Sequence, residues 1–112
     1  MLTIEALKNY GANTAEGLMR CVNNEAFYLK MVNMGLADLN FDKLYRAVAA
    51  GDAKEAFEAA HALKGVVGNL ALTPLYTPVC ELTELLRGKD EIGDIAALMA
   101  EITAQLNKAR AL

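Results

Sequence analysis

Residues 51–72, with the sequence GDAKEAFEAAHALKGVVGNLAL, decide the fold of this chain. Asp52, followed three residues later by Glu55, is a helix start signal, because its side chain can accept a hydrogen bond from the free backbone N–H groups there. Beyond this signal, apolar side chains recur every three or four residues for about five turns, the spacing of one helix face. These residues are Ala53, Ala56, Phe57, Ala60, Leu63, Val67 and Leu70. The stretch therefore predicts a helix that reaches about Ala71.

Two short helices are predicted near the N-terminus. The first covers about residues 3–10 and ends at Gly11, and the second begins at Asn13, whose carbonyl oxygen can cap it with Glu16 three residues on. The apolar face expected for the second helix consists of Ala15, Leu18, Met19 and Val22.

Two further helices are predicted before the central one. One opens at the pair Asn23-Asn24 and reaches about Leu36, and the other is capped by Asn40 and ends near Gly51. Together they could form one interrupted arm. The apolar stripe expected for the first of them consists of Phe27, Met31 and either Met34 or Leu36.

The chain after residue 72 predicts two more helices. Thr73-Pro74 is a start signal, and Thr77-Pro78 repeats it, so this helix either kinks or restarts at the second proline. A tight connection over residues 87–90 then leads to the last helix. The stripe of the first consists of Leu75, Val79, Leu82 and Leu86, and that of the second of Ile92, Ile95, Leu98, Ile102, Leu106 and Ala109.

Four long helical segments with one apolar stripe each, joined by short connections, predict an all-α fold. We expect an antiparallel up-down four-helix bundle with short additional N-terminal helices. The 112 residues, 54% of them hydrophobic, suit a single domain over residues 1–112. An extended coiled coil is excluded, because the stripes follow short capped helices and none sustains a heptad over three or four repeats.

Composition excludes several classes of function. A net charge of −3 and a pI near 5.1 give no basic surface for nucleic acid. Cys21 and Cys80 are isolated, which favours reduced thiols and a cytoplasmic protein. The sequence has no export leader, no apolar run long enough for a membrane, no phosphate-binding glycine loop and no cluster of metal ligands.

His61 is the only histidine of the chain. At about 100° per residue, it lies roughly 120° from the centre of its helix's apolar face, so we expect the ring at or beyond the edge of the core. Lys64, Gly65 and Gly68 follow on the same side. Two glycines cost a helix about 2 kcal/mol together, so bare backbone near the ring needs a reason. The alternatives are a surface histidine without function and glycines that serve helix packing.

Lys64 lies one turn beyond the histidine. A cation there favours the neutral, nucleophilic ring and would neutralise an anion formed on it. The alternative is an ordinary lysine whose stem covers apolar surface.

The stretch from Gly51 to Leu72 resembles the signature of histidine-containing phosphotransfer (HPt) domains. Its core is an alanine-histidine-x-leucine-lysine-glycine run, here Ala60 to Gly65, followed by an asparagine and small residues. Weaker similarity covers most of the chain, including the Phe27-Tyr28-Leu29 helix and the Cys80-x-Leu82 helix that ends in residues 87–90. Two positions depart from the pattern: Ala71 replaces a commoner glycine, and Thr83 stands where a glutamate is usual.

The resemblance implies a phosphorelay intermediate of a two-component system. His61 would accept a phosphoryl group from the aspartyl phosphate of a receiver domain and transfer it to another receiver domain. Lys64 would bind the phosphoryl oxygens, and Gly65 and Gly68 would leave clearance for the partner. The partner would dock on the His61 helix and the helix before it, with Phe57 or Val66 in an exposed apolar patch.

Further expectations follow from the resemblance. The chain would be a phosphocarrier without kinase activity, a cytoplasmic monomer that needs no cofactor or metal of its own, with Mg²⁺ on the receiver. Its partners would be response-regulator receiver domains and a hybrid histidine kinase, with no nucleic acid or membrane. There are three alternatives: a structural adaptor bundle, the phosphotransfer module of a larger chemotaxis-type kinase, and a Cys80–His61 nucleophile pair.

Overall fold

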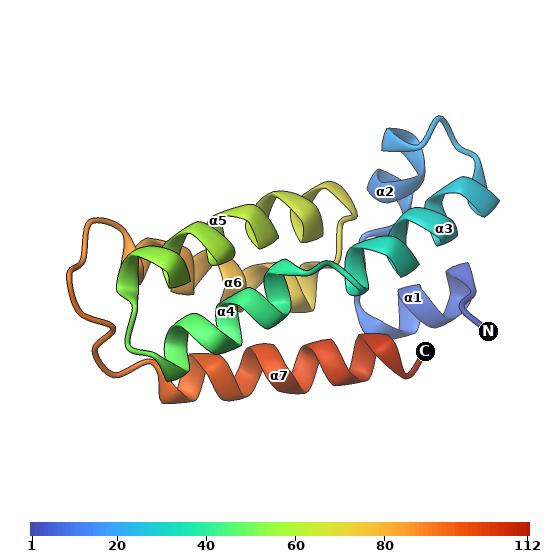
Figure 1. Ribbon diagram of the computed structural model, residues 1–112. Coiled ribbons are helices and arrows are strands. Elements are labelled where there is room, and N and C mark those ends of the chain that lie inside the picture. Colours follow the sequence, from blue (N-terminus) through green and yellow to red (C-terminus); the bar gives the residue numbers. More distant parts are fainter.

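Seven α-helices and no strand make up the computed structural model, which describes residues 1–112 (Figure 1). The all-α prediction is confirmed. The helices are α1 (Ile4–Tyr10), α2 (Thr14–Arg20), α3 (Glu25–Leu36), α4 (Asn40–Ala49), α5 (Ala53–Asn69), α6 (Thr73–Leu86) and α7 (Ala96–Arg110).

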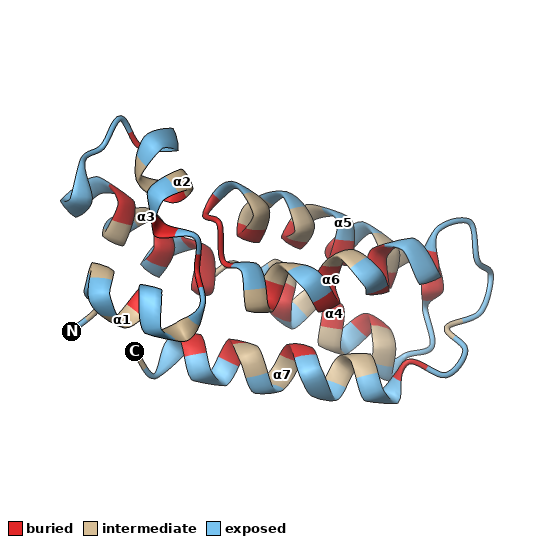
Figure 2. Cartoon of the chain, turned by 180° about the vertical axis from the view of Figure 1, so that it is seen from behind, coloured by how far each residue is buried: buried red, intermediate tan, exposed pale blue.

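The helices α4 to α7 form an elongated bundle, and α1, α2 and the first part of α3 gather at one end of it (Figure 1). Helix α5 packs against both α4 and α6, and α6 also packs against α7. The molecule measures 42 × 23 × 19 Å, so the bundle sets its long axis. The predicted four-helix bundle with short N-terminal helices is confirmed. Both chain termini lie at the end opposite the connection between α6 and α7 (Figures 1 and 2).

Helix α5 begins as the sequence predicts. The Asp52 carboxylate accepts a hydrogen bond from the Glu55 backbone N–H at 3.1 Å. The buried face of α5 consists mainly of small side chains, which let α4 and α6 approach closely, and it faces the inside of the bundle in Figure 2. Its buried residues are Ala53, Ala56, Ala59, Ala60, Leu63 and Val67. The opposite face is therefore left to solvent and to His61.

The predicted apolar face of α2 is confirmed only at Leu18, which is partly buried against the core. Met19 and Val22 are 64% and 84% exposed, whereas Thr14 and Gly17 are buried. Helix α2 has only seven residues, and Val22 lies beyond its end with a left-handed φ of 50°, which turns its side chain outward. Gly17 is buried because the Tyr28 ring occupies the space that a side chain would need.

The predicted stripe of α3 is also confirmed only in part. The prediction holds for Met31, which is partly buried against the core, and for the alternative Leu36, which is buried. Phe27 and Met34 are instead 45% and 57% exposed, and Tyr28 and Val32 are the other buried side chains. The Tyr28 hydroxyl explains the difference, because it donates a hydrogen bond to the Leu70 carbonyl at 2.8 Å and so fixes which face turns inward. Burial raises the pKa of Tyr28, in keeping with a neutral hydroxyl.

Three boundaries differ from the prediction. Asn40 does not cap α4; the Asp38 carboxylate accepts a hydrogen bond from the Asn40 backbone N–H at 2.8 Å. Helix α6 runs through the buried Pro78 without restarting. The connection after α6 extends to Ile95, because Gly88 and Gly93 adopt left-handed φ angles of 68° and 71° that interrupt any helix.

Candidate functional site

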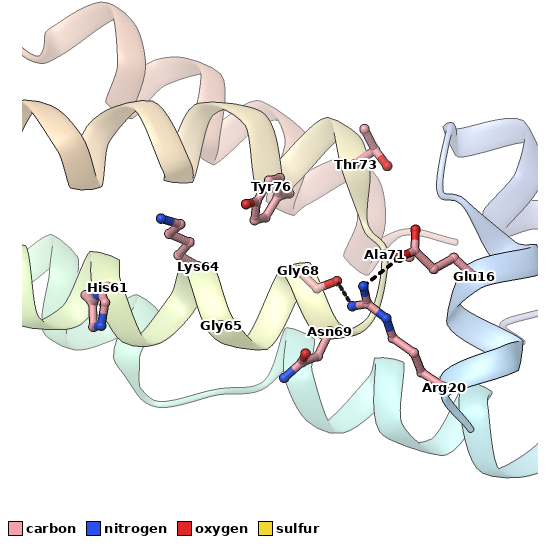
Figure 3. Close-up of a pocket in the computed structure, with 10 residues that line it drawn as sticks. All are labelled: Glu16, Arg20, His61, Lys64, Gly65, Gly68, Asn69, Ala71, Thr73 and Tyr76. Carbon is pink, nitrogen blue, oxygen red and sulfur yellow. Dashed lines mark hydrogen bonds and ion pairs between the residues drawn. The ribbon is translucent and has the colours of Figure 1, made fainter. Parts of the chain in front are cut away.

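His61 lies in the middle of α5, and its ring is exposed, as the helical spacing predicts (Figure 3). One turn earlier on the same helix, the Phe57 ring stacks on the imidazole, with ring centroids 5.7 Å apart and planes inclined by 19°. The Arg87 guanidinium carbon lies 5.1 Å from the centroid of the Phe57 ring. Phe57 is half-buried and lies between the two, so it restricts the orientation of the histidine ring.

Lys64 is half-buried and extends toward α6 (Figure 3). Its ammonium nitrogen lies 3.7 Å from a carboxylate oxygen of Glu84. The same carboxylate accepts two hydrogen bonds from the Arg87 guanidinium, at 3.0 and 3.1 Å. These contacts lower the pKa of Glu84, mainly through the hydrogen bonds from Arg87 and its positive charge, with a smaller effect of Lys64.

The sequence did not identify Glu84 as a site residue. The spacing of Glu84 and Arg87 is that of an ion pair within a helix, but nothing in the sequence shows that α6 turns Glu84 toward Lys64. Thr83, which replaces a usual glutamate of the resembled pattern, is buried, and its hydroxyl donates to the Val79 carbonyl at 2.8 Å. The carboxylate that contacts Lys64 belongs to the next residue along α6, Glu84.

The two glycines after His61 have different surroundings. A Cβ atom added at Gly65 would meet no atom within 4 Å, so this position is open. A Cβ atom at Gly68 would lie 3.0 Å from a ring carbon of Tyr76 in α6. Gly68 therefore serves the packing of α5 against α6, which is the alternative explanation that the sequence left open for it.

His61, Lys64, Gly65 and Gly68 line one open groove of about 630 Å³ (Figure 3). Residues of α5 and α6 form its length, and Glu16 and Arg20 of α2 lie at its far end. The Arg20 guanidinium forms an ion pair with Glu16 and donates a hydrogen bond to the Gly68 carbonyl at 2.8 Å. The structure thus brings the four predicted site residues together, and adds a contribution from the N-terminal helices.

Other candidate chemistries find less support. Cys80 lines a separate hollow on α6 that does not include His61, and Cys21 is buried. No group of three or more histidine, cysteine, aspartate or glutamate side chains is arranged to hold a metal ion. None of the seven helices has the length and apolar character that a membrane span requires.

Fold and site together define a small helical-bundle protein with one exposed histidine beside a lysine and an open glycine. The family model described as Hpt domain matches residues 36–112, more than half of the chain, and the chain therefore belongs to the Hpt domain family. Hpt domains are phosphocarriers in phosphorelay signalling and interact with receiver domains. Searches of curated proteins and of solved structures find no match to this chain.

Proposed function

We propose that His61 accepts a phosphoryl group from the aspartyl phosphate of a response-regulator receiver domain and transfers it to another receiver domain. The observation that carries this proposal is the exposed position of the only histidine, in a groove within the region that matches the Hpt family. A hybrid histidine kinase would supply the phosphoryl group to the first receiver.

The reaction is an in-line displacement at phosphorus. The lone pair of the unprotonated ring nitrogen forms the P–N bond as the P–O bond to the aspartate breaks, and the aspartate leaves as a carboxylate. The proton on the other ring nitrogen can pass to water. Transfer to the second receiver reverses these steps. Such a reaction depends mostly on positioning and on neutralising charge, so the chain needs no cofactor of its own, and Mg²⁺ is expected on the receiver.

The residues around His61 have separate roles in this proposal. Phe57 orients the ring by stacking on it, and Lys64 binds the phosphoryl oxygens once the group is in place. Gly65 gives the partner's backbone access to the ring, because no other atom of the chain occupies that space. Gly68 gives the partner less room than Gly65, because the Tyr76 ring lies against it. We further propose that the chain acts as a cytoplasmic monomer.

The groove around His61 indicates where a receiver domain would dock. A partner centred on His61 would cover the exposed side of α5 and the edges of its neighbours. Val66 is half-buried and would lie within 3.2 Å of a side chain at Gly35, so it belongs to the contact between α5 and α3 more than to an exposed patch. Phe57 is half-buried as well and supports the ring of His61 instead of forming an apolar patch of its own.

The test is a transfer assay with a purified receiver domain that has been phosphorylated with labelled acetyl phosphate. We expect acid-labile label on the wild-type chain and none on His61→Gln. Because His61 is exposed and makes no hydrogen bond to another side chain, this variant should melt at the wild-type temperature. Equal labelling of both proteins would refute the proposal, and a chain that takes no label from any receiver would favour an adaptor.

A further inference from the structure

We infer that Glu84 holds Lys64 toward α6 while His61 is unphosphorylated, and that Lys64 exchanges Glu84 for the phosphoryl group when His61 carries one. This inference rests on the proposed function. It assigns Glu84 a positioning role that acts through Lys64, and it makes the stability of the phosphorylated state depend on a residue that does not touch the histidine.

The contact between Lys64 and Glu84 is suited to exchange. The two charged atoms are 3.7 Å apart, and the side chains are 30% and 53% exposed. Ion pairs with this exposure contribute little to stability, because water screens them and ordering two long side chains costs entropy. Lys64 can therefore leave Glu84 at small cost.

Glu84 does not lose its charge partner when Lys64 leaves. The Arg87 guanidinium holds the carboxylate through two hydrogen bonds, at 3.0 and 3.1 Å, and also lies over the ring of Phe57. A phosphoryl group carries a charge of about −1.5 to −2 and three acceptor oxygens, so it attracts an ammonium group more strongly than a carboxylate already paired with Arg87. The phosphoryl group should win the competition for Lys64.

Glu84→Gln should favour the phosphorylated chain, because it removes the attraction that keeps Lys64 on α6 and so frees the lysine for the phosphoryl group. We expect the equilibrium constant for transfer from receiver to His61 to rise about two- to fivefold, the range that corresponds to an exposed ion pair.

A double-mutant cycle shows whether Glu84 acts through Lys64. A receiver domain is loaded with labelled acetyl phosphate and mixed with the chain, and the distribution of label between the two proteins is measured at equilibrium. The chains compared are wild type, Glu84→Gln, Lys64→Met and the double variant. Methionine keeps the length and helix propensity of lysine without its charge. The fold-change that Glu84→Gln causes in the equilibrium constant should fall toward one in the Lys64→Met background. An equal effect in both backgrounds, or no effect in either, would overturn the inference.

Glu81→Gln is the matched control. Glu81 lies on α6 one turn before Glu84, is exposed and forms no ion pair, so this variant makes the same change in net charge. It should leave the equilibrium unchanged, and a shift equal to that of Glu84→Gln would also overturn the inference. A wild-type chain that takes no label at His61 would refute the proposed function. Normal labelling of His61 with no effect of Glu84→Gln would refute this inference alone.

Discussion

Gly65 and Gly68 look equivalent in the sequence, since both lie within one helix on the histidine side, but their surroundings in the structure differ. Gly65 has no neighbouring atom at the place of a Cβ, whereas Gly68 lies against the Tyr76 ring. The helical spacing could place both residues on one side of α5. It could not show the ring of Tyr76, because that contact depends on how α6 is rotated against α5.

Alanine substitutions should reveal this difference. Gly65→Ala should raise the free energy of unfolding by up to about 1 kcal/mol, because alanine is the better helix former and meets nothing there. Gly68→Ala should gain less or lose stability, because the Tyr76 ring must move. Urea unfolding followed by circular dichroism measures both. Equal gains for the two variants would mean that Tyr76 does not constrain Gly68.

At the scale of the helices, the start signals were the most informative part of the sequence. Asp52, Asn13 and Asn24 each cap a helix where the pattern places one. The buried faces of α2 and α3 could not be predicted in the same way. Helix α2 has only seven residues, which fit several stripes equally well, and α3 carries large apolar side chains on its exposed face as well as on its buried face. Tyr28 settles the choice through its buried hydrogen bond to Leu70, a contact between residues 42 positions apart.

The role of Glu84 could not be predicted from the sequence for a similar reason. Its ion pair with Lys64 joins α5 to α6, so it depends on the relative rotation of two helices and on no periodic pattern within either. The histidine, the lysine and the two glycines were predictable because they lie on a single helix, where the spacing of residues fixes their relative directions. Contacts between helices needed the structure.

The contact between α1 and α7 predicts a pH-dependent stability. The Tyr10 hydroxyl donates to the Gln105 carbonyl at 3.2 Å, and burial, with a contribution from the nearby Glu101 charge, raises the pKa of Tyr10 to about 12. The folded state thus holds this proton more tightly than the unfolded chain, where the pKa is near 10.0. Its contribution to stability is complete below pH 10.0 and is lost as the pH rises to about 12.

The measurement compares wild type with Tyr10→Phe, which cannot ionise at this position. The difference between their free energies of unfolding should be constant below pH 10.0 and should shrink toward pH 12. All other residues are the same in both proteins, so their contributions to the difference cancel. A difference that stays constant over this whole interval would show that Tyr10 is solvated in the folded state.

At the scale of the whole molecule, residues before the Hpt-matched region hold one end of the bundle. The Asn13 backbone N–H donates to the Ala71 carbonyl at 2.9 Å, and Arg20 donates to the Gly68 carbonyl. Tyr28 donates to the Leu70 carbonyl. These three contacts converge on the end of α5 and the turn after it, so the N-terminal helices stabilise the helix that carries His61.

Removal of residues 1–35 should therefore destabilise what remains. The truncated chain loses the buried side chains of Leu7, Tyr28 and Val32, and burial of each such group is worth about 1.5–3 kcal/mol. We expect the free energy of unfolding to fall by more than about 3 kcal/mol, with loss of a cooperative transition as the extreme case. Thermal melts followed by circular dichroism check this. An unchanged melting temperature would show that residues 36–112 fold independently.

The position of the two termini, at the end opposite the connection between α6 and α7, has a consequence for assembly into larger polypeptides (Figure 1). Any segment fused to either terminus leaves the molecule from the same pole. The bundle is then attached at one end only, and a flexible linker there allows the side of α5 that carries His61 to point in many directions. Joining the termini to each other and opening the chain between residues 88 and 93 would keep all seven helices intact, which makes this fold a good subject for circular permutation.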